Sequence, residues 1–195
     1  MGITPDNWKD VFKVIYFTAD MHFGHENVIK FDNRPFKSLE EMDEELIKRW
    51  NNKVGKADLV YSLGDMFWKN QDYVTNILKR LNGQIILIKG NHDRWLHNAK
   101  NKSLLAGLKD YDEITIDSKK IVLSHYPIHF YNGHYHGAIM LYGHTHSTRE
   151  DDFVKQIVSQ LNNLECPVQM YNVGCMHWNY EPVSLDEILM VKNKM

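Results

Sequence analysis

The sequence has little cysteine and no long apolar segment. Its 195 residues include two cysteines, Cys166 and Cys175, which form no CxxC pair and cannot build a disulfide framework. The longest aliphatic run, residues 85–88, is far shorter than the ~20 residues that a membrane-spanning helix needs. Residues 1–10 lack the basic and apolar pattern of a signal peptide. These absences favour a soluble protein of the reducing cytoplasm with no membrane partner.

The sequence also lacks a strong charge of either sign. Its formal net charge is -2 and its pI is near 6.6, which argues against a generic basic surface for long nucleic acid. Hydrophobic residues make up 43% of the chain, enough for a sizeable core. A length near 200 residues fits one domain, so we expect a single domain over residues 1–195.

Short apolar runs alternate with helical patterns along the chain, as in an α/β or layered α+β fold. Strands are predicted over residues 14–18, 59–63, 84–89, 113–117, 120–124, 138–142 and 168–173. Capping boxes that begin at Ser38, Ser147 and Ser184 predict the start of three helices, and a fourth helix is expected over residues 73–81. Residues 126–137 are the one candidate for a mobile loop.

The chain is rich in histidine, with 11 residues, and many of them follow predicted strands. Loops beyond the carboxyl ends of strands are where α/β folds place their sites, because several loops converge there. Five such clusters occur in order along the chain. Their metal-ligating side chains are Asp20 and His22, Asp65, Asn91 with His92 and Asp93, His125, and His144 with His146.

The donor types favour transition metals. Two Asp carboxylates, one Asn carbonyl and four His nitrogens can fill two adjacent cation sites, and no thiolate is present. Such mixed ligands suit Mn, Fe, Zn or Co better than Mg or Ca. Each cluster alone has an ordinary explanation, since Gly-Asp after a strand is commonly a turn. Gly64, Gly90 and Gly143, each next to a cluster, allow sharp turns and close approach.

Together the five clusters resemble the five motif blocks of the calcineurin-like metallophosphoesterase superfamily. The resemblance runs from about Val14 to Ile188, and no block is missing. Residues 20–25, 34–36, 172–174 and 182–187 resemble the small bacterial and phage branch of that family. The implied fold is a four-layer α/β/β/α sandwich of two mixed sheets flanked by helices.

The resemblance implies a role for each cluster. Asp65 would bridge two divalent ions, and His92 would be the catalytic histidine that contacts phosphate, with Asp93 orienting it. The cofactors would be two transition-metal ions, manganese first, with Fe, Zn, Ni or Co as alternatives, and a hydroxide between them would attack the phosphorus. The first ion would be held by Asp20, His22 and His146, and the second by Asn91, His125 and His144.

Four further residues are candidates for substrate binding. His25 lies three residues after His22 and with Asn27 can face the substrate, although Asn27 can equally cap a helix. Arg34 and Arg94 are candidate phosphate-binding cations, and a surface ion pair is the alternative for each. Residues 133–136 repeat the pattern of residues 143–146 but follow no predicted strand, so we treat them as a loop whose contact with substrate stays open. His97 is expected at the surface, and His129 and His177 can either line the site or be structural.

The substrate class follows from the resemblance and from length. The core fold accounts for nearly the whole chain, which leaves little room for the capping domain of large nucleases or the extended surfaces of protein phosphatases. We therefore expect a phosphodiesterase for a small nucleotide, including cyclic mono- or oligonucleotides. The alternatives are a phosphomonoesterase or nuclease of the same superfamily and a non-catalytic binding scaffold, and the oligomeric state stays open. Aromatic residues near the predicted site loops can stack on a base or, equally, pack in the core: Tyr126, Phe130, Tyr131, Tyr135 and Trp178.

Overall fold

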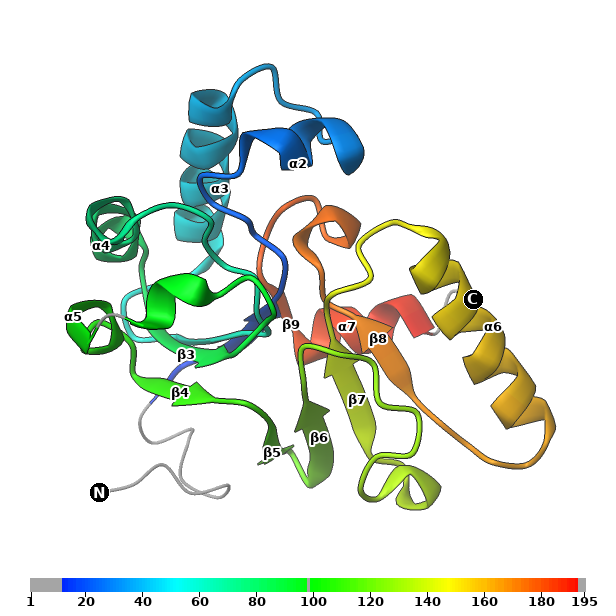
Figure 1. Ribbon diagram of the computed structural model, residues 1–195. Helices are drawn as coiled ribbons and strands as arrows, with labels where there is room; N and C mark the ends of the chain where they lie inside the picture. The colour runs from blue at the N-terminus through cyan, green and yellow to red at the C-terminus, as the bar shows by residue number, and fades with distance from the viewer. Residues whose placement is uncertain (1–11, 98, 193–195) are drawn as a thin grey trace.

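The computed structural model describes residues 12–97 and 99–192, whose strands form two mixed sheets (Figure 1). The first sheet has the order β4 (Gly107–Lys109), β3 (Gln84–Ile88), β2 (Leu59–Ser62), β1 (Ile15–Thr18) and β9 (Val183–Ser184). The second has the order β5 (Asp112–Ile116), β6 (Lys119–Leu123), β7 (Ile139–Tyr142) and β8 (Met170–Asn172). Only the β1–β9 and β5–β6 pairs are antiparallel. The expected pair of mixed sheets is confirmed.

Helices cover the outer faces of both sheets. The α-helices are α2 (Glu26–Phe31), α3 (Leu39–Lys53), α4 (Gln71–Arg80), α5 (Ala99–Lys102), α6 (Arg149–Asn163) and α7 (Leu185–Lys192). The 3₁₀ turns in the described part of the chain are η1 (Arg94–His97), η2 (His134–His136) and η3 (Cys175–His177). Helices α3 and α4 lie on the side of the first sheet, and α6 lies on the side of the second (Figure 1). Among the described residues, no helix has the length and apolar character to span a membrane.

Alternating side chains build three hydrophobic layers. In β1, Phe17 enters the core between the sheets, whereas Tyr16 packs against the outer core with α3 and α4. In β7, Leu141 enters the same inner core and Met140 faces α6. Because successive side chains of a strand point to opposite faces, each central strand serves two cores. The result is the expected four-layer arrangement.

Two helix starts show how local sequence sets the boundaries. Ser38 accepts a hydrogen bond from the backbone N–H of Glu41 (3.1 Å), as the first capping box predicts. The second box is displaced by one residue, because Thr148, not Ser147, is the N-cap of α6 and accepts from the N–H of Glu150 (3.2 Å). The prediction missed α2 and the short edge strands β4 and β9, which carry too few residues for a periodic signal.

The two sheets meet at one edge, beyond the carboxyl ends of their parallel strands. Ala19, directly after β1, donates its N–H to the carbonyl of Val173, directly after β8 (2.9 Å). The N–H of Cys175 returns a bond to the carbonyl of Ala19 (2.9 Å). These bonds join strands of different sheets and bring the loops of both sheets together at this edge.

Candidate metal centre

The ligand side chains expected from the sequence converge at this edge in two groups that share one carboxylate. In the first group, Nε2 of His22 lies 3.2 Å from Nε2 of His146, and the latter lies 3.8 Å from Oδ1 of Asp20. Ligand atoms of all three residues lie within 4.8 Å of one another. We call Asp20, His22 and His146 the first half of the centre.

The second half consists of Asn91, His125 and His144. Oδ1 of Asn91 lies 2.9 Å from Nε2 of His125 and 3.1 Å from Nδ1 of His144. Oδ2 of Asp65 lies 3.6 Å from Nε2 of His125 and 3.9 Å from Nε2 of His22, so this oxygen faces both halves. Its other oxygen, Oδ1, accepts the backbone N–H of His92 (2.8 Å), which fixes the carboxylate in that orientation.

The backbone is strained at most of these positions. Five of the seven expected ligands have left-handed backbone conformations, with φ between 47° and 71°, although none is glycine: Asp20, His22, Asp65, His144 and His146. Each such residue costs about 1–3 kcal/mol, and strain of this kind concentrates at functional sites. The conformation turns each side chain sharply out of the strand direction and toward the shared centre.

Two glycines make room for this packing. Gly64 has φ +94°, and a Cβ there would lie 2.5 Å from Nδ1 of His125. A Cβ on Gly90 would collide with the carboxylate of Asp65. The close approach expected at these glycines is confirmed, since any larger residue would displace a ligand side chain.

Burial makes the two carboxylates poor anions in the absence of a cation. Burial raises the pKa of Asp20 to about 6, although its neighbours His146 and His125 lower it. Burial also raises the pKa of Asp65 to about 6, against the opposing hydrogen bond from the N–H of His92. Removing a carboxylate from water disfavours its charged form, and a bound cation reverses that preference.

Two of the ligand histidines, His22 and His144, are held as neutral rings, the form that ligates metals. Burial lowers the pKa of His22 well below its usual value, and burial lowers that of His144. His146 differs, because burial would lower its pKa but the carboxylate of Asp32, 3.3 Å from its Nδ1, raises it. A carboxylate on the far nitrogen of a ligating imidazole fixes the ring and increases its basicity.

Arg34 stabilises the loop that carries Asp20 in the first half of the centre. Its guanidinium donates to the carbonyls of Asp20 (2.7 Å) and Met21 (2.8 Å), and its Nε lies 3.0 Å from the carboxylate of Asp32. The Arg34 side chain is fully buried. The expectation that Arg34 binds substrate is therefore wrong for this structure, because all its donors face the protein. Its position explains how the Asp20 loop and Asp32 are fixed together.

Asp93 also differs from expectation. Its carboxylate accepts backbone N–H groups of Asp65 (2.8 Å), Met66 (3.0 Å) and Gly90 (2.8 Å), together with the indole N–H of Trp95 (2.9 Å). With four donors satisfied, it ties together the loops after β2 and β3. It therefore positions Asp65, and no bond from its carboxylate to the His92 ring is seen in the described residues.

The donor atoms present fit a pair of divalent cations. Nδ1 of His125 can only donate to the carbonyl of Leu63 (2.7 Å), so its Nε2 carries a lone pair when the ring is neutral. That lone pair faces Oδ1 of Asn91, a second acceptor, and Oδ1 of Asp20 is buried without a hydrogen-bond partner. Facing acceptors and an orphaned carboxylate oxygen call for a cation between them. Cys175 is no ligand candidate, because its buried thiol donates to the backbone carbonyl of Asp20 (3.3 Å).

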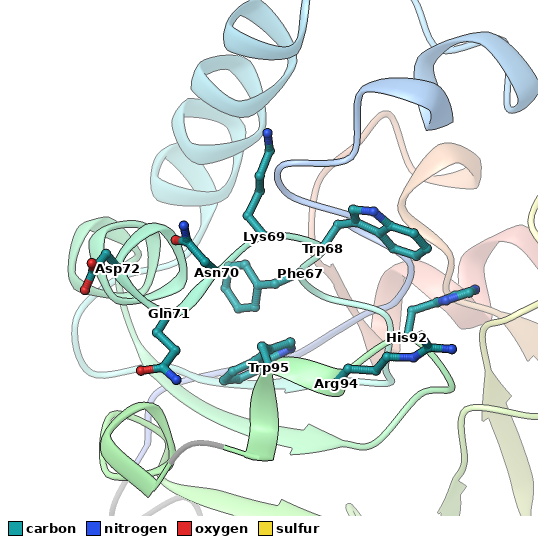
Figure 2. A pocket seen from close by; sticks show the side chains of 9 residues that line it. All are labelled: Phe67, Trp68, Lys69, Asn70, Gln71, Asp72, His92, Arg94 and Trp95. Atoms are coloured by element: carbon teal, nitrogen blue, oxygen red, sulfur yellow. The ribbon is translucent and has the colours of Figure 1, made fainter.

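A pocket of 720 Å³ opens beside the centre, and two sequence-predicted residues line it (Figure 2). His92 has its Nε2 3.9 Å from Oδ2 of Asp65, and its side chain is 36% exposed. Arg94, two residues later, also lines the pocket and is exposed. The pocket therefore borders the ligand cluster through His92, whose ring lies 5.8 Å from that of His22 (centroid to centroid).

Trp68 is a site residue that the sequence reasoning missed. Its indole is 45% exposed, lines the same pocket, and lies 4.7 Å from the His92 ring (centroid to centroid). The sequence did hold a signal for this residue. Trp68 lies three residues after the expected ligand Asp65, just as the candidate His25 lies three residues after the expected ligand His22. The two loops pair through a bridge between Phe23 and Phe67.

Of the remaining candidates, His25 borders the site through a contact with a pocket residue, and no such contact is seen for Asn27, His177 and His129 in the described part of the chain. His25 stacks on Trp68 (3.9 Å between centroids, interplanar angle 16°) and so borders the site. It is the N-cap of α2, so Asn27 lies inside the helix, exposed, and does not cap it. Nε2 of His177 lies 2.9 Å from the carbonyl oxygen of His146 and thus braces a ligand loop, whereas Nε2 of His129 is buried without a partner.

The loop of residues 126–137 divides between the site and the opposite end of the second sheet. Tyr126 lies against the His125 and His144 rings, at 5.0 and 4.6 Å between centroids. Residues 133–136 precede β7, and a Cβ on Gly133 would contact Lys120 at the start of β6. They lie at the amino ends of β6 and β7, away from the ligands (Figure 1). Of the aromatics considered for stacking, Tyr131 is buried and Trp178 packs against the inner core.

Comparison with known proteins agrees with this geometry. The sequence model of the calcineurin-like phosphoesterase superfamily domain matches residues 15–178. An uncharacterized protein of Methanocaldococcus jannaschii is 36% identical over 182 residues, covering 92% of each chain. The gene 66 protein of Mycobacterium phage L5 is 28% identical over 163 residues, covering 68% of this chain and 77% of its own. A crystal structure of an Aquifex aeolicus protein of unknown function has a TM-score of 0.68 and 26% identity, and covers 91% of this chain and 98% of its own.

Proposed function

The chain belongs to the calcineurin-like phosphoesterase superfamily, a family of metal-dependent phosphoesterases, and from this we propose that it hydrolyses a small phosphodiester. The substrate class we propose is a nucleotide, including cyclic mono- and oligonucleotides. One observation carries the proposal: the Asp65 carboxylate faces two groups of ligands, and His92 lies at the mouth of the adjoining pocket. That arrangement fits two cations acting on one phosphoryl group.

The proposed roles follow from what each side chain contacts. Asp20, His22 and His146 would hold one divalent ion, Asn91, His125 and His144 the other, and Asp65 both. When bound, such a pair of ions activates water and withdraws charge from the phosphoryl oxygens. His92, half-exposed at the pocket, can donate a proton to the leaving oxygen or stabilise developing charge.

The charge of the site supports a diester of modest size. Two divalent ions outweigh the two carboxylates of Asp20 and Asp65, so the loaded centre attracts a phosphodiester monoanion. The adjoining pocket, at 720 Å³, is within the range of about 300–1,000 Å³ typical of small-molecule sites. A small organic substituent therefore fits beside His92 without requiring a long groove.

A direct test is the turnover of bis(p-nitrophenyl) phosphate, p-nitrophenyl phosphate and a panel of cyclic nucleotides by protein stripped with chelator and reloaded with manganese. We expect diester hydrolysis to exceed monoester hydrolysis. Asp65→Asn should abolish turnover, and His92→Asn should lower kcat by about 10²–10⁴-fold while metal content is kept. His136→Asn is the matched control, because this exposed histidine belongs to the 133–136 turn at the other end of the second sheet.

Several results would contradict the proposal. Absence of turnover after loading with Mn, Fe, Zn, Ni and Co in separate trials would remove the enzymatic function. Wild-type turnover in His92→Asn would remove this residue from the reaction. Faster hydrolysis of the monoester than of the diester would reassign the protein as a phosphomonoesterase.

A further inference from the structure

The pocket beside His92 has one large aromatic side chain at its mouth. Trp68 forms its upper wall in Figure 2, with His92 and Arg94 beneath it and the polar residues that begin α4 at the far end. Since Trp68 is 45% exposed, part of the indole is open to a ligand in the pocket. An exposed tryptophan beside a polar site needs an explanation, because large apolar surface facing water is unfavourable.

The indole is held rigidly in this position. His25 stacks on one face, and the backbone N–H of Trp68 donates to the carbonyl of Phe23 (2.9 Å). Two other aromatic residues of the pocket lining are also held in place. Phe67 packs edge-on against Trp95 (5.1 Å between centroids), and the indole N–H of Trp95 donates to the carboxylate of Asp93. A planar ligand that lies on the open part of the indole therefore costs little ordering of the protein.

The polar residues of the pocket leave hydrogen-bonding groups available. In the described residues, no hydrogen bond or ion pair engages the guanidinium of Arg94. Asn70 uses its Oδ1 to cap α4 at the N–H of Tyr73 (3.2 Å), which leaves its Nδ2 for an acceptor. The pocket thus offers an aromatic surface, an unpaired cation next to His92, and an amide donor farther away.

We propose that this pocket binds the nucleoside part of the substrate, with the base stacked on Trp68 and Arg94 contacting the phosphate beside His92. The inference rests on the proposed phosphodiesterase function and names the group that the enzyme recognises. A nucleobase matches the combination of features, because it presents a flat π-surface to the indole and hydrogen-bonding edges to the amide. The phosphate then lies between Arg94 and the ligand cluster.

The test compares two product analogues, one that carries the base and one that carries a hydroxyl group in its place. Binding of AMP and of ribose 5-phosphate to the manganese-loaded protein is measured by isothermal titration calorimetry. We expect AMP to bind at least about fivefold more tightly, since stacking of one base on an aromatic side chain is typically worth that factor or more. Trp68→Ala should abolish the difference, and Trp68→Phe should restore most of it.

Arg94 is tested with the same pair of ligands. Arg94→Met should weaken AMP and ribose 5-phosphate by the same factor, because both carry the phosphate. Phe153→Ala and Arg80→Met are matched controls, since Phe153 is 59% exposed on α6 and Arg80 pairs with Glu44 at the surface. Neither control should change either affinity.

Failure of this inference is distinguishable from failure of the proposed function. Equal binding of AMP and ribose 5-phosphate, no binding of either, or a preference for AMP that survives Trp68→Ala would overturn the nucleoside pocket even if bis(p-nitrophenyl) phosphate is hydrolysed. Conversely, a base preference that depends on Trp68 would uphold the pocket even if no diester is turned over, since binding is measured without turnover.

Discussion

The two halves of the candidate metal centre are built differently. In the first half, Asp20 and His22 are almost completely buried, and Arg34 and Asp32 hold them from beneath. In the second half, His125 is also buried, but Asn91 is exposed and His144 is half-buried, so water reaches these two ligands. Asp65 faces both halves. The first half is therefore held by buried charged partners, whereas the second half includes the exposed amide of Asn91.

This difference predicts that the two halves bind their cations with different affinities. Ligands whose partners are already fixed lose little freedom when a cation binds, whereas exposed ligands must be ordered and desolvated at that moment. We therefore expect a tightly held ion in the first half and a more readily exchanged ion in the second, whose Asn91 ligand is exposed.

The largest difference in manganese affinity is expected when one histidine is removed from each half in turn. His144→Ala should keep one high-affinity manganese ion, whereas His22→Ala should lose it. The difference in affinity should exceed about 100-fold, because even loss of a ligand's hydrogen-bond partner costs about 10–100-fold. Calorimetric titration with manganese and elemental analysis after gel filtration measure it. His136→Ala is the control, and equal losses in both ligand variants would contradict the asymmetry.

A smaller effect on metal affinity is expected when Asp32, whose carboxylate contacts His146 of the first half, is changed. Asp32→Asn removes the carboxylate that raises the pKa of His146 and leaves the ligands themselves in place. The affinity of the first half for manganese should fall by about 10–100-fold, while the second half changes little. The same substitution at the exposed Asp186 of α7 is the control. If Asp32→Asn binds metal like the unmodified protein, this carboxylate has no role in metal affinity.

The smallest effect is a gradual change with pH in how strongly manganese stabilises the protein. The pKa values of Asp20 and Asp65 are raised to about 6, so both must release protons to bind a cation below that pH. The increase in melting temperature caused by manganese should therefore be large at pH 7.5 and shrink as pH falls through 6, with affinity dropping up to about tenfold per pH unit for each proton displaced. A manganese-induced shift that is equal at pH 7.5 and pH 5 would contradict this dependence.

The metal-free protein should respond to pH in the opposite direction at these two groups. Because the folded-state pKa of each carboxyl is raised above the value of 3.8, its contribution to stability is fully present below about pH 4. That contribution is lost as pH rises through 6, where folding must keep a buried charge. Thermal unfolding with and without manganese across this range separates the two opposing trends.

Local sequence was informative where a ligand follows a strand directly. The strand β2 and the residues Gly64 and Asp65 after it form a continuous signal, and the structure brings Asp65 to the expected edge. Arg34 and Asp93 were misread because the partners of a charged side chain depend on distant loops. The guanidinium is enclosed by residues 20–21 and Asp32, and no local pattern distinguishes that burial from exposure.

Trp68 shows the same limit for the substrate pocket. Its neighbour His25 lies 43 residues earlier, and only the bridge between Phe23 and Phe67 places the two rings face to face. Residues 133–136 show the converse, because their histidines copy a ligand motif but the missing strand before them already argued against ligation. They lie at the amino ends of β6 and β7, where the direction of the strands puts them far from the carboxyl-end site.

The sequence by itself determined the alternation of strands and helices, the ligand types at the strand ends, and the resemblance that named the fold, because these are encoded in contiguous residues. Only the tertiary structure decided which half of the centre is buried, what Asp32, Arg34 and Asp93 bind, and that Trp68 borders the pocket. Those properties depend on contacts between residues far apart in the chain, and burial, which sets their charge and hydrogen bonding, exists only after the sheets have packed.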